Sequence, residues 1–266
     1  MSKNAFAQAA ALADALNAAE TARAPIAPIS RAHPAATELD AYAVQAFNIE
    51  RGLKSGRRIV GRKIGLTSVS VQAQFGVNQP DCGILFADME VPDRTEVPAG
   101  ELIAPRVEAE IGFVIGKSIE HPDVTVAELV SSIAYAMPAI EIVDSRIVDW
   151  KINLFDTIAD NASSARFVLG STFHKLCGLD LRLCGMMLEK NGEPVSFGAG
   201  AACMGHPLNA VRWLARVMAQ EGRPLRAGDV VLSGALGPMV PAAPGDRFTI
   251  RIEKLGDAAV SFQAKT

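Results

Sequence analysis

The chain has 266 residues, which is enough for one well-filled hydrophobic core or two small ones. Hydrophobic residues make up 49% of it and charged residues 21%, and this ordinary globular composition excludes a disordered or fibrous protein. The formal net charge is −3, whereas most nucleic-acid-binding proteins carry a basic excess. No apolar run approaches the roughly 20 residues that span a bilayer, so neither a nucleic acid nor a membrane is an expected partner.

Residues 1–56 have a helical pattern and are expected to form an N-terminal helical extension. Apolar residues near helical spacing predict a helix over about the first 22 residues: Ala7, Ala11, Leu12 and Leu16. Three prolines then predict a stiff, irregular connection. Thr37, followed three residues later by Asp40, is typical of a capped helix start, and Gly56 ends this second helix. Its predicted apolar stripe consists of Leu39, Val44, Phe47 and Leu53.

From residue 57 onward the pattern changes to short strands separated by glycine, proline, asparagine and aspartate. The strand-like segments are RRIVGRKIGLT, EAEIGFVIG, PAIEIVDS, SARFVLG, DLRLCGMMLEKNGEPV, DVVLSGALG and DRFTIRIEKLG. NGEP in the fifth segment predicts a hairpin turn, and helical patterns interrupt the strands at 126–137 and 207–220. The fold class is therefore α+β, with the extension at 1–56 and a larger, mostly β domain at 57–266 forming one integrated unit.

Cysteine and histidine give little sign of chemistry. The four cysteines lack the spacing of a zinc site or a disulfide framework: Cys82, Cys177, Cys184 and Cys203. Acidic residues interrupt the Ala-rich N-terminus, unlike a secretory or transit peptide. We therefore expect buried, reduced thiols in a cytoplasmic protein. The histidines are scattered, and His206, which precedes Pro207, is expected to begin a helix.

The segment PRVEAEIGFVIG is the most informative part of the sequence. Because side chains alternate along a strand, Glu108 and Glu110 lie on one face, roughly 7 Å apart at a rise of about 3.3 Å per residue. That face becomes apolar at Val114, so the two carboxylates are expected to be partly buried, where a divalent cation would relieve their repulsion and lost hydration. The alternative is a solvated strand face with two surface acids.

A third carboxylate, Glu141, lies inside the apolar run AIEIV, where an unpaired charge is costly. One interpretation is a buried glutamate in an ion pair with Arg106 or Arg146. A second interpretation joins it to Glu108 and Glu110 in a metal site. Three carboxylates without histidine or cysteine favour a hard, oxygen-preferring ion, Mg²⁺ or Mn²⁺.

Lys63 lies in the apolar strand-like segment IVGRKIGL, an unusual place for a lysine. Three carboxylates, one divalent cation and one lysine sum to zero charge, so a site of this composition is balanced before an anionic substrate arrives. A lysine in this place can anchor a carboxylate or exchange protons. The alternative is a side chain that reaches solvent at a strand end.

Three loops contribute further candidates. Asp81 in QPDCG is a possible site acid, although aspartate is also common in turns. The run Asp160-Asn161-Ala162-Ser163 offers hydrogen-bonding side chains or merely caps a turn. Ser233 and Gly234 follow a strand-like segment, and the backbone N–H groups there could hold a carboxylate.

Seven segments, in chain order, resemble the 2-hydroxypenta-2,4-dienoate (2-oxopent-4-enoate) hydratases. They are GRKIGLTS, QPDCG, PRVEAEIGFVIG, PAIEIVDSRIVDWK, DTIADNAS, GHPLNAVRWLA and SGALGPMVPAAPGDRF. These hydratases belong to the hydratase and decarboxylase branch of the fumarylacetoacetate hydrolase superfamily. The resemblance implies a mixed β-sandwich roll of the C-terminal-domain type of that superfamily, preceded by the helical extension.

The resemblance also implies the roles of the candidate residues. The metal ligands would be Glu108, Glu110 and Glu141, and the catalytic residues Lys63 and Asp81. Residues near the substrate would be Asp160, Asn161, Ser163, Ser233 and Gly234. The ion, Mg²⁺ or Mn²⁺, would hold a 2-oxo acid by its C1 carboxylate and C2 oxygen, and water would add at C4 to give a 4-hydroxy-2-oxo acid.

The implied activity is that of a hydro-lyase in the meta-cleavage degradation of aromatic compounds. Family members form homo-oligomers, so the resemblance implies a pentamer or decamer, and a downstream or parallel pathway enzyme is a further candidate partner. The main competing activity is that of a 2-oxo-3-hexenedioate (4-oxalocrotonate) decarboxylase with the same metal chemistry. The segment SGALGPMV resembles the hydratase version of its loop and favours hydration.

A carbon–carbon hydrolase and a non-catalytic subunit fit the sequence less well than a hydratase. A hydrolase of the superfamily needs a base pair on an N-terminal lid, where only His33 and Glu38 are available, and His33 precedes Pro34. A non-catalytic partner subunit of a decarboxylase would not need Lys63.

Overall fold

The computed structural model describes residues 7–69, 72–73 and 77–264 of the chain. The strands are β1 Ile59–Gly65, β2 Asp81–Phe86, β3 Thr95–Val97, β4 Arg106–Ile115, β5 Ile133–Val143, β6 Ser164–Leu169, β7 Gly185–Lys190, β8 Glu193–Ala199, β9 Val230–Leu232, β10 Val240–Pro241, β11 Arg247–Ile252 and β12 Gly256–Phe262. The α-helices are α1 Ala9–Ala22, α2 Glu38–Lys54, α4 Val126–Ser132, α5 Leu154–Ala159 and α6 Pro207–Gln220. Short 3₁₀ turns are η1 Ile29–Ala32, η2 Ala87–Met89, η3 Val148–Trp150, η4 Asn161–Ser163 and η5 Gly200–Ala202.

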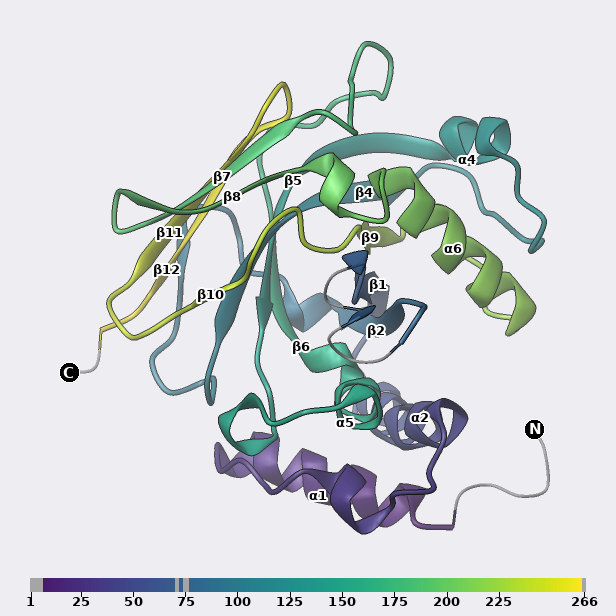
Figure 1. The fold of residues 1–266 in the computed structure, drawn as a ribbon, viewed down its shortest axis with the longest axis vertical. Coiled ribbons are helices and arrows are strands. Elements are labelled where there is room, and N and C mark those ends of the chain that lie inside the picture. Colours follow the sequence, from purple (N-terminus) through teal and green to yellow (C-terminus); the bar gives the residue numbers. More distant parts are fainter. Residues whose placement is uncertain (1–6, 70–71, 74–76, 265–266) are drawn as a thin grey trace.

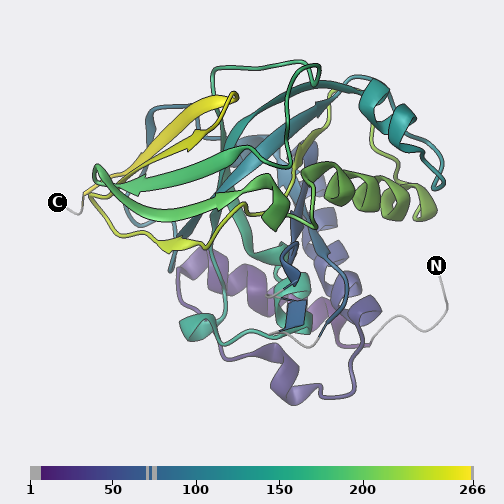
Figure 2. The same ribbon diagram turned by 45° about the horizontal axis from the view of Figure 1, so that its top comes forward.

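Two mixed sheets form the body of the molecule (Figure 1). The seven-stranded sheet has the order β2-β1-β9-β4-β5-β6, with β10 paired to β4, and the five-stranded sheet has the order β3-β12-β11-β7-β8. The two sheets share one apolar core, to which β4 contributes Ile111 and Phe113, and β11 contributes Phe248 and Ile250. Figure 2 shows the five-stranded sheet beside the long strands β4 and β5. This arrangement is the predicted α+β sandwich.

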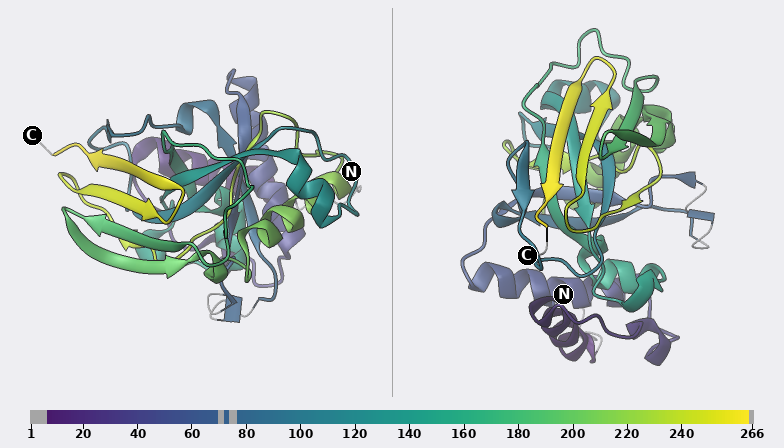
Figure 3. Two further views of the ribbon diagram at one scale, coloured as in Figure 1. Left: turned by 90° about the horizontal axis from the view of Figure 1, so that it is seen from above. Right: turned by 90° about the vertical axis from the view of Figure 1, so that its left-hand side faces the viewer.

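Helices α1, α2 and α5 form a layer at one end of the sheets (Figure 3). They have a small apolar cluster of their own, in which Leu16 and Val44 pack with Phe155 and Ile158. The predicted start of α2 is confirmed, because Thr37 and Asp40 form a reciprocal capping box. Across the described residues, no helix combines the length and apolar character needed to cross a bilayer.

The predicted apolar stripe of α2 is wrong except at Val44. Leu39 is 81% exposed, and Phe47 and Leu53 are also exposed. The buried face of the helix carries Val44 and Ile49 together with small or polar residues, namely Ala41, Gln45 and Gly52. The reason is close packing: a Cβ at Gly52 would lie 2.9 Å from the ring of Phe86, so α2 approaches β2 through residues that a hydrophobicity pattern does not count as core.

The helix predicted over 126–137 ends at Ser132, and β5 begins at Ile133. Strand β5 pairs with β4 along the whole length of β4. A helix continuing to residue 137 would leave the second half of β4 without this partner, so sheet pairing outweighs the local helical pattern.

The predicted hairpin is confirmed between β7 and β8, where Lys190 pairs with Glu193. Asn191 and Gly192 both have positive φ, 56° and 88°, which is the geometry of a two-residue type I′ turn. The second helical prediction, 207–220, is also confirmed, and His206 caps α6 by accepting a hydrogen bond from the N–H of Leu208. Three cysteines are buried as expected, whereas Cys177 is exposed; all four are free thiols.

Candidate metal centre and surrounding site

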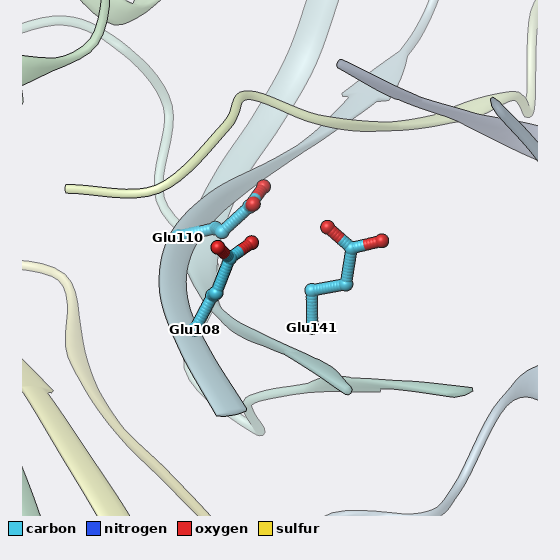
Figure 4. A group of neighbouring side chains, drawn as sticks. All are labelled: Glu108, Glu110 and Glu141. Atoms are coloured by element: carbon cyan, nitrogen blue, oxygen red, sulfur yellow. The ribbon is translucent and has the colours of Figure 1, made fainter. Parts of the chain in front are cut away.

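The antiparallel pairing of β4 with β5 brings the three glutamates together. Glu108 lies directly opposite Glu141 in the register, and Glu110 follows two residues later on the same face of β4. One carboxylate oxygen from each residue lies within 4.8 Å of the others. Figure 4 shows Glu108 and Glu110 extending from one strand toward Glu141 on the other.

The cluster is not a solvated strand face. Glu110 and Glu141 are fully buried, while Glu108 keeps partial access to solvent. Glu141 is not paired with either of the arginines considered from the sequence. Arg146 pairs with Asp160, Arg106 stacks on the ring of Trp150, and the cation beside Glu141 is Lys63.

The carboxylates leave polar atoms unsatisfied. Among the described residues, Glu110 Oε1 and both oxygens of Glu141 have no hydrogen-bond partner of ordinary geometry, and Glu110 Oε2 accepts only the N–H of Gly234, at 2.8 Å. Burial, followed by the charge of Glu141, raises the pKa of Glu110 well above its usual range and that of Glu108 to about 7. Converging, uncompensated carboxylates of this kind fit a hard divalent cation, which supplies the missing positive charge.

Lys63 is the fourth member of the cluster. It is 3% exposed, so its side chain does not reach solvent. Its Nζ lies 3.2 Å from Glu141 Oε2 and donates a hydrogen bond to the carbonyl of Ala162, at 2.9 Å. Burial alone lowers the pKa of Lys63, but the carboxylates around it, led by Glu141, outweigh burial and raise the pKa. Lys63 is therefore an ammonium group at the edge of the glutamate cluster.

Asp81 lies next to Lys63, across from a glycine. It is the first residue of β2, and its register partner on β1 is Gly65. A Cβ on Gly65 would lie 2.2 Å from Asp81 Oδ1 and 3.4 Å from Lys63 Nζ, so both groups converge beside this glycine. Asp81 Oδ2 accepts a hydrogen bond from Thr157, at 3.4 Å, whereas Oδ1 has no partner among the described residues. Burial raises the pKa of Asp81, and Lys63 opposes this rise.

Ser233 and Gly234 follow β9 and support Glu110. The hydroxyl of Ser233 accepts a hydrogen bond from the N–H of Ile111, at 3.2 Å, and Gly234 donates its N–H to Glu110. Gly234 has a φ of +100°, and a Cβ there would lie 2.3 Å from the hydroxyl oxygen of Thr67. The turn therefore requires glycine at this position.

The polar groups of the loop from Asp160 to Ser163 face either the surrounding protein or the site around Lys63. The carboxylate of Asp160 accepts hydrogen bonds from the backbone and side chain of Arg146, and the amide of Asn161 bonds both backbone groups of Ile84. Ala162 presents its carbonyl to Lys63, while the buried hydroxyl of Ser163 has no partner among the described residues. Of the three side chains proposed to meet substrate, only that of Ser163 has an unused polar atom.

Several residues that contact the site escaped prediction. Thr157 lies in the segment DTIADNAS but showed no pattern that links it to Asp81. Thr67 packs against Gly234, and the thiol of Cys203 donates to the carbonyl of Ser233, at 2.9 Å. These contacts depend on tertiary packing, and no local spacing could have revealed them.

The comparisons with known proteins agree with this geometry. The family model for the fumarylacetoacetate (FAA) hydrolase C-terminal domain matches residues 70–263. The chain is 59% identical over 227 residues to the TodF product hydratase of Pseudomonas putida (strain F1), with 85% of each chain covered. It is 54% identical over 240 residues to the 2-keto-4-pentenoate hydratase of Paraburkholderia xenovorans, covering 90% of this chain and 89% of that protein.

A solved structure has closely the same fold as this chain. The 4-oxalocrotonate decarboxylase from Pseudomonas putida G7, complexed with magnesium and adipate, superposes with a TM-score of 0.92 at 39% identity, covering 96% of this chain and 97% of the second chain. These findings confirm the resemblance predicted from the seven sequence segments. The chain belongs to the fumarylacetoacetate hydrolase family.

Proposed function

We propose that the chain is a metal-dependent hydratase that adds water to 2-hydroxypenta-2,4-dienoate (2-oxopent-4-enoate) or a close homologue. The product is a 4-hydroxy-2-oxo acid, and the reaction belongs to the meta-cleavage degradation of aromatic compounds. The observation that carries the proposal is the convergence of three glutamates with a buried lysine, whose Nζ lies 3.2 Å from Glu141. Relatives named hydratases at 54% and 59% identity support the reaction type.

Glu108, Glu110 and Glu141 would hold the ion, for which we propose Mg²⁺ or Mn²⁺ because all three ligands are carboxylates. When bound, such a cation supplies positive charge that stabilises negative charge developing on the 2-oxygen of the substrate. The backbone N–H of Gly234 orients Glu110, and Lys63 orients Glu141. These two contacts hold the ligand set in place before an ion binds.

Hydration of the dienoate takes place in two stages. The 2-hydroxyl group loses its proton as C5 gains one, which makes C2 a ketone, and water then supplies a hydroxyl group to C4 and a proton to C3. Lys63 and Asp81 are the candidates for these proton transfers and for orienting the water, because both lie at the cluster and converge beside Gly65. Lys63 is fixed by the carbonyl of Ala162, and Asp81 keeps one oxygen without a partner among the described residues. Burial in this low-dielectric region strengthens the electrostatic effect of each group on a bound anion.

We propose that five further residues act on the substrate either directly or through a neighbouring group: Asp160, Asn161, Ser163, Ser233 and Gly234. The free hydroxyl of Ser163 makes it the best candidate for direct contact. Gly234 and Ser233 would act through Glu110, and Asp160 and Asn161 through the loop that carries the carbonyl of Ala162.

We also propose a homo-oligomer, a pentamer or decamer, working in the cytoplasm. Large apolar side chains that are exposed on the single chain support further association, among them Leu39, Phe173 and Phe197. Free thiols at all four cysteines support a reducing compartment. A second enzyme of the same pathway is the proposed additional partner.

The competing activity is decarboxylation, favoured by the close superposition on the 4-oxalocrotonate decarboxylase structure. Product identification by NMR separates the two. We expect a 4-hydroxy-2-oxo acid from 2-hydroxypenta-2,4-dienoate in the presence of Mg²⁺ or Mn²⁺, and no product with a chelator. CO₂ release from 2-oxo-3-hexenedioate, without hydration of the pentadienoate, would overturn the hydratase proposal.

A further inference from the structure

Strand β2, which carries Asp81, lies at the edge of the seven-stranded sheet. Among the described strands its only neighbour is β1, so the backbone groups on its outer side need partners from elsewhere. Side chains provide them. The N–H of Cys82 donates to the hydroxyl of Tyr42, at 3.2 Å, and the carbonyl of Cys82 accepts from the amide of Gln45, at 3.0 Å.

The next outward-facing residue, Ile84, is held in the same manner by Asn161. The amide of Asn161 accepts the N–H of Ile84, at 2.8 Å, and donates to its carbonyl, at 3.0 Å. Three side chains thus occupy the position of a missing strand along the open edge of β2. Tyr42 and Gln45 come from one helix, α2, where they lie one turn apart.

Gln45 also ties the edge of β2 to α5. Its amide nitrogen donates a second hydrogen bond to the carbonyl of Ile158, at 3.1 Å, and the side chain is 6% exposed. Thr157, the preceding residue on α5, donates to Asp81 Oδ2. The backbone next to Asp81 and the carboxylate itself are therefore held by one connected set of hydrogen bonds.

The two α2 residues lie outside residues 70–263, the part of the chain that matches the family model. They belong to the helical extension, residues 1–56, which we propose forms one integrated unit with the catalytic domain at 57–266. No pattern in the sequence assigned this extension a role. Its contacts with Cys82 reach the residue adjacent to a candidate catalytic acid.

We propose that Tyr42 and Gln45 are positioning residues for Asp81, and that the helical extension completes the site by fixing the open edge of β2. This inference rests on the proposed function. The space around Asp81 is narrow, because a Cβ on Gly65 would meet Asp81 Oδ1 at 2.2 Å. A shift of β2 away from β1 would therefore change the position of Asp81 relative to Lys63.

The test compares Tyr42→Phe and Gln45→Leu with the wild-type chain, each full-length and loaded with Mg²⁺. We expect kcat for hydration of 2-hydroxypenta-2,4-dienoate to fall about 10-fold to 100-fold, because small misplacements of catalytic groups have effects of this size. The KM and the Mg²⁺ affinity are expected to change little, since neither residue belongs to the glutamate cluster. Ser30→Ala is the matched control: it removes the hydrogen bond from the Ser30 hydroxyl to Asp156, at 2.7 Å, which ties the extension to α5 without reaching β2.

A double-mutant cycle separates positioning from general stabilisation. In an Asp81→Asn background, Tyr42→Phe should reduce the residual kcat by much less than in the wild type, because the group that it positions is already lost. An equal fold-loss in both backgrounds, or a kcat for both single variants equal to that of wild type, would overturn the inference.

Amide hydrogen exchange provides a readout that does not depend on the activity. We expect faster exchange at Cys82 in Tyr42→Phe and Gln45→Leu than in wild type and Ser30→Ala, and unchanged exchange would also refute the inference. If the wild-type chain releases CO₂ instead of hydrating its substrate, the proposed function fails, and the same cycle is then measured on decarboxylation.

Discussion

In the five-stranded sheet, charged side chains lie toward solvent and form ion pairs between neighbouring strands, such as Arg251 with Glu189. In the seven-stranded sheet, several charged side chains are buried inside the protein, among them Lys63, Asp81, Glu110 and Glu141. The buried polar side-chain atoms that lack a hydrogen-bond partner among the described residues all belong to the seven-stranded sheet or to η4. They are in Arg62, Asp81, Glu110, Glu141, Ser163 and Ser164.

The contrast indicates that both sheets supply the apolar core, whereas the candidate site belongs to the seven-stranded sheet. Apolar burial between the sheets stabilises the fold, whereas uncompensated polar groups cost stability unless a ligand satisfies them. Substitutions of the buried charged residues of the seven-stranded sheet should therefore affect turnover and ion binding, and substitutions of apolar core residues, such as those of the five-stranded sheet, should affect unfolding. The following predictions test this division, beginning with the largest effect.

Lys63→Ala is expected to reduce kcat by about 100-fold to 10,000-fold, the range typical of a lost proton-transfer group. Far-ultraviolet circular dichroism should show that folding is preserved. Lys54→Ala, on the surface of α2 and 75% exposed in its side chain, is the control and should keep wild-type turnover. Wild-type turnover in Lys63→Ala would remove lysine from the mechanism.

Phe248→Ala is expected to lower the free energy of unfolding by about 3–5 kcal/mol, because Phe248 is fully buried between the sheets and packs against Phe262. At 25 °C the kcat of the folded fraction should be unchanged. Arg251→Ala on the same strand should cost about 0–1 kcal/mol, because it removes only a surface ion pair. Urea unfolding measures both values, and a large kcat effect in Phe248→Ala would argue against the division between the sheets.

Mg²⁺ or Mn²⁺ is expected to stabilise the chain, since binding to the folded state alone at a hundred times the Kd adds about 2.7 kcal/mol. For a chain of this size that corresponds to a rise in Tm of about 5–10 °C. Glu110→Gln keeps the acceptor for the N–H of Gly234 but removes one ligand charge, so its Tm should respond much less. Equal responses of the two proteins would place the ion elsewhere.

The stability of the metal-free chain is expected to fall as the pH rises from about 4.5 to about 7. Burial and Glu141 raise the pKa of Glu108 from 4.5 to about 7, so in this window the folded state binds more protons than the unfolded state. Folding in this window is therefore coupled to the uptake of a proton by Glu108, and a higher pH makes that uptake less favourable. Urea unfolding in chelator at pH 5 and pH 8 measures the fall, and Glu108→Gln should reduce it. A stability that rises over the same window would contradict the buried cluster.

Local patterns in the sequence determined several features correctly. The capping box at Thr37 and Asp40, the Asn191-Gly192 turn and the face shared by Glu108 and Glu110 follow from backbone geometry over a few residues. Such features depend on neighbours in the chain, so one sequence is sufficient to predict them.

Further features depend on partners that are distant in sequence. Residues 133–137 form a strand because β4 needs a partner, and α2 buries Gln45 and Gly52 because β2 presents an open edge and a phenylalanine there. The ion pair of Asp160 with Arg146 likewise depends on the return of the chain after α5. No spacing within these segments distinguishes such outcomes from the patterns that were predicted.

The sequence by itself determined that three carboxylates and a lysine occupy apolar, strand-like segments. Because a buried charge needs a compensating partner, it also indicated that these groups form a site. The tertiary structure decided that they meet. The register of β4 with β5 places Glu108 opposite Glu141, and β1, which is separated from β4 by β9, brings Lys63 to Glu141. It also decided that the edge of β2 is closed by side chains of the helical extension, since an unpaired strand edge takes whichever donors and acceptors the fold places beside it.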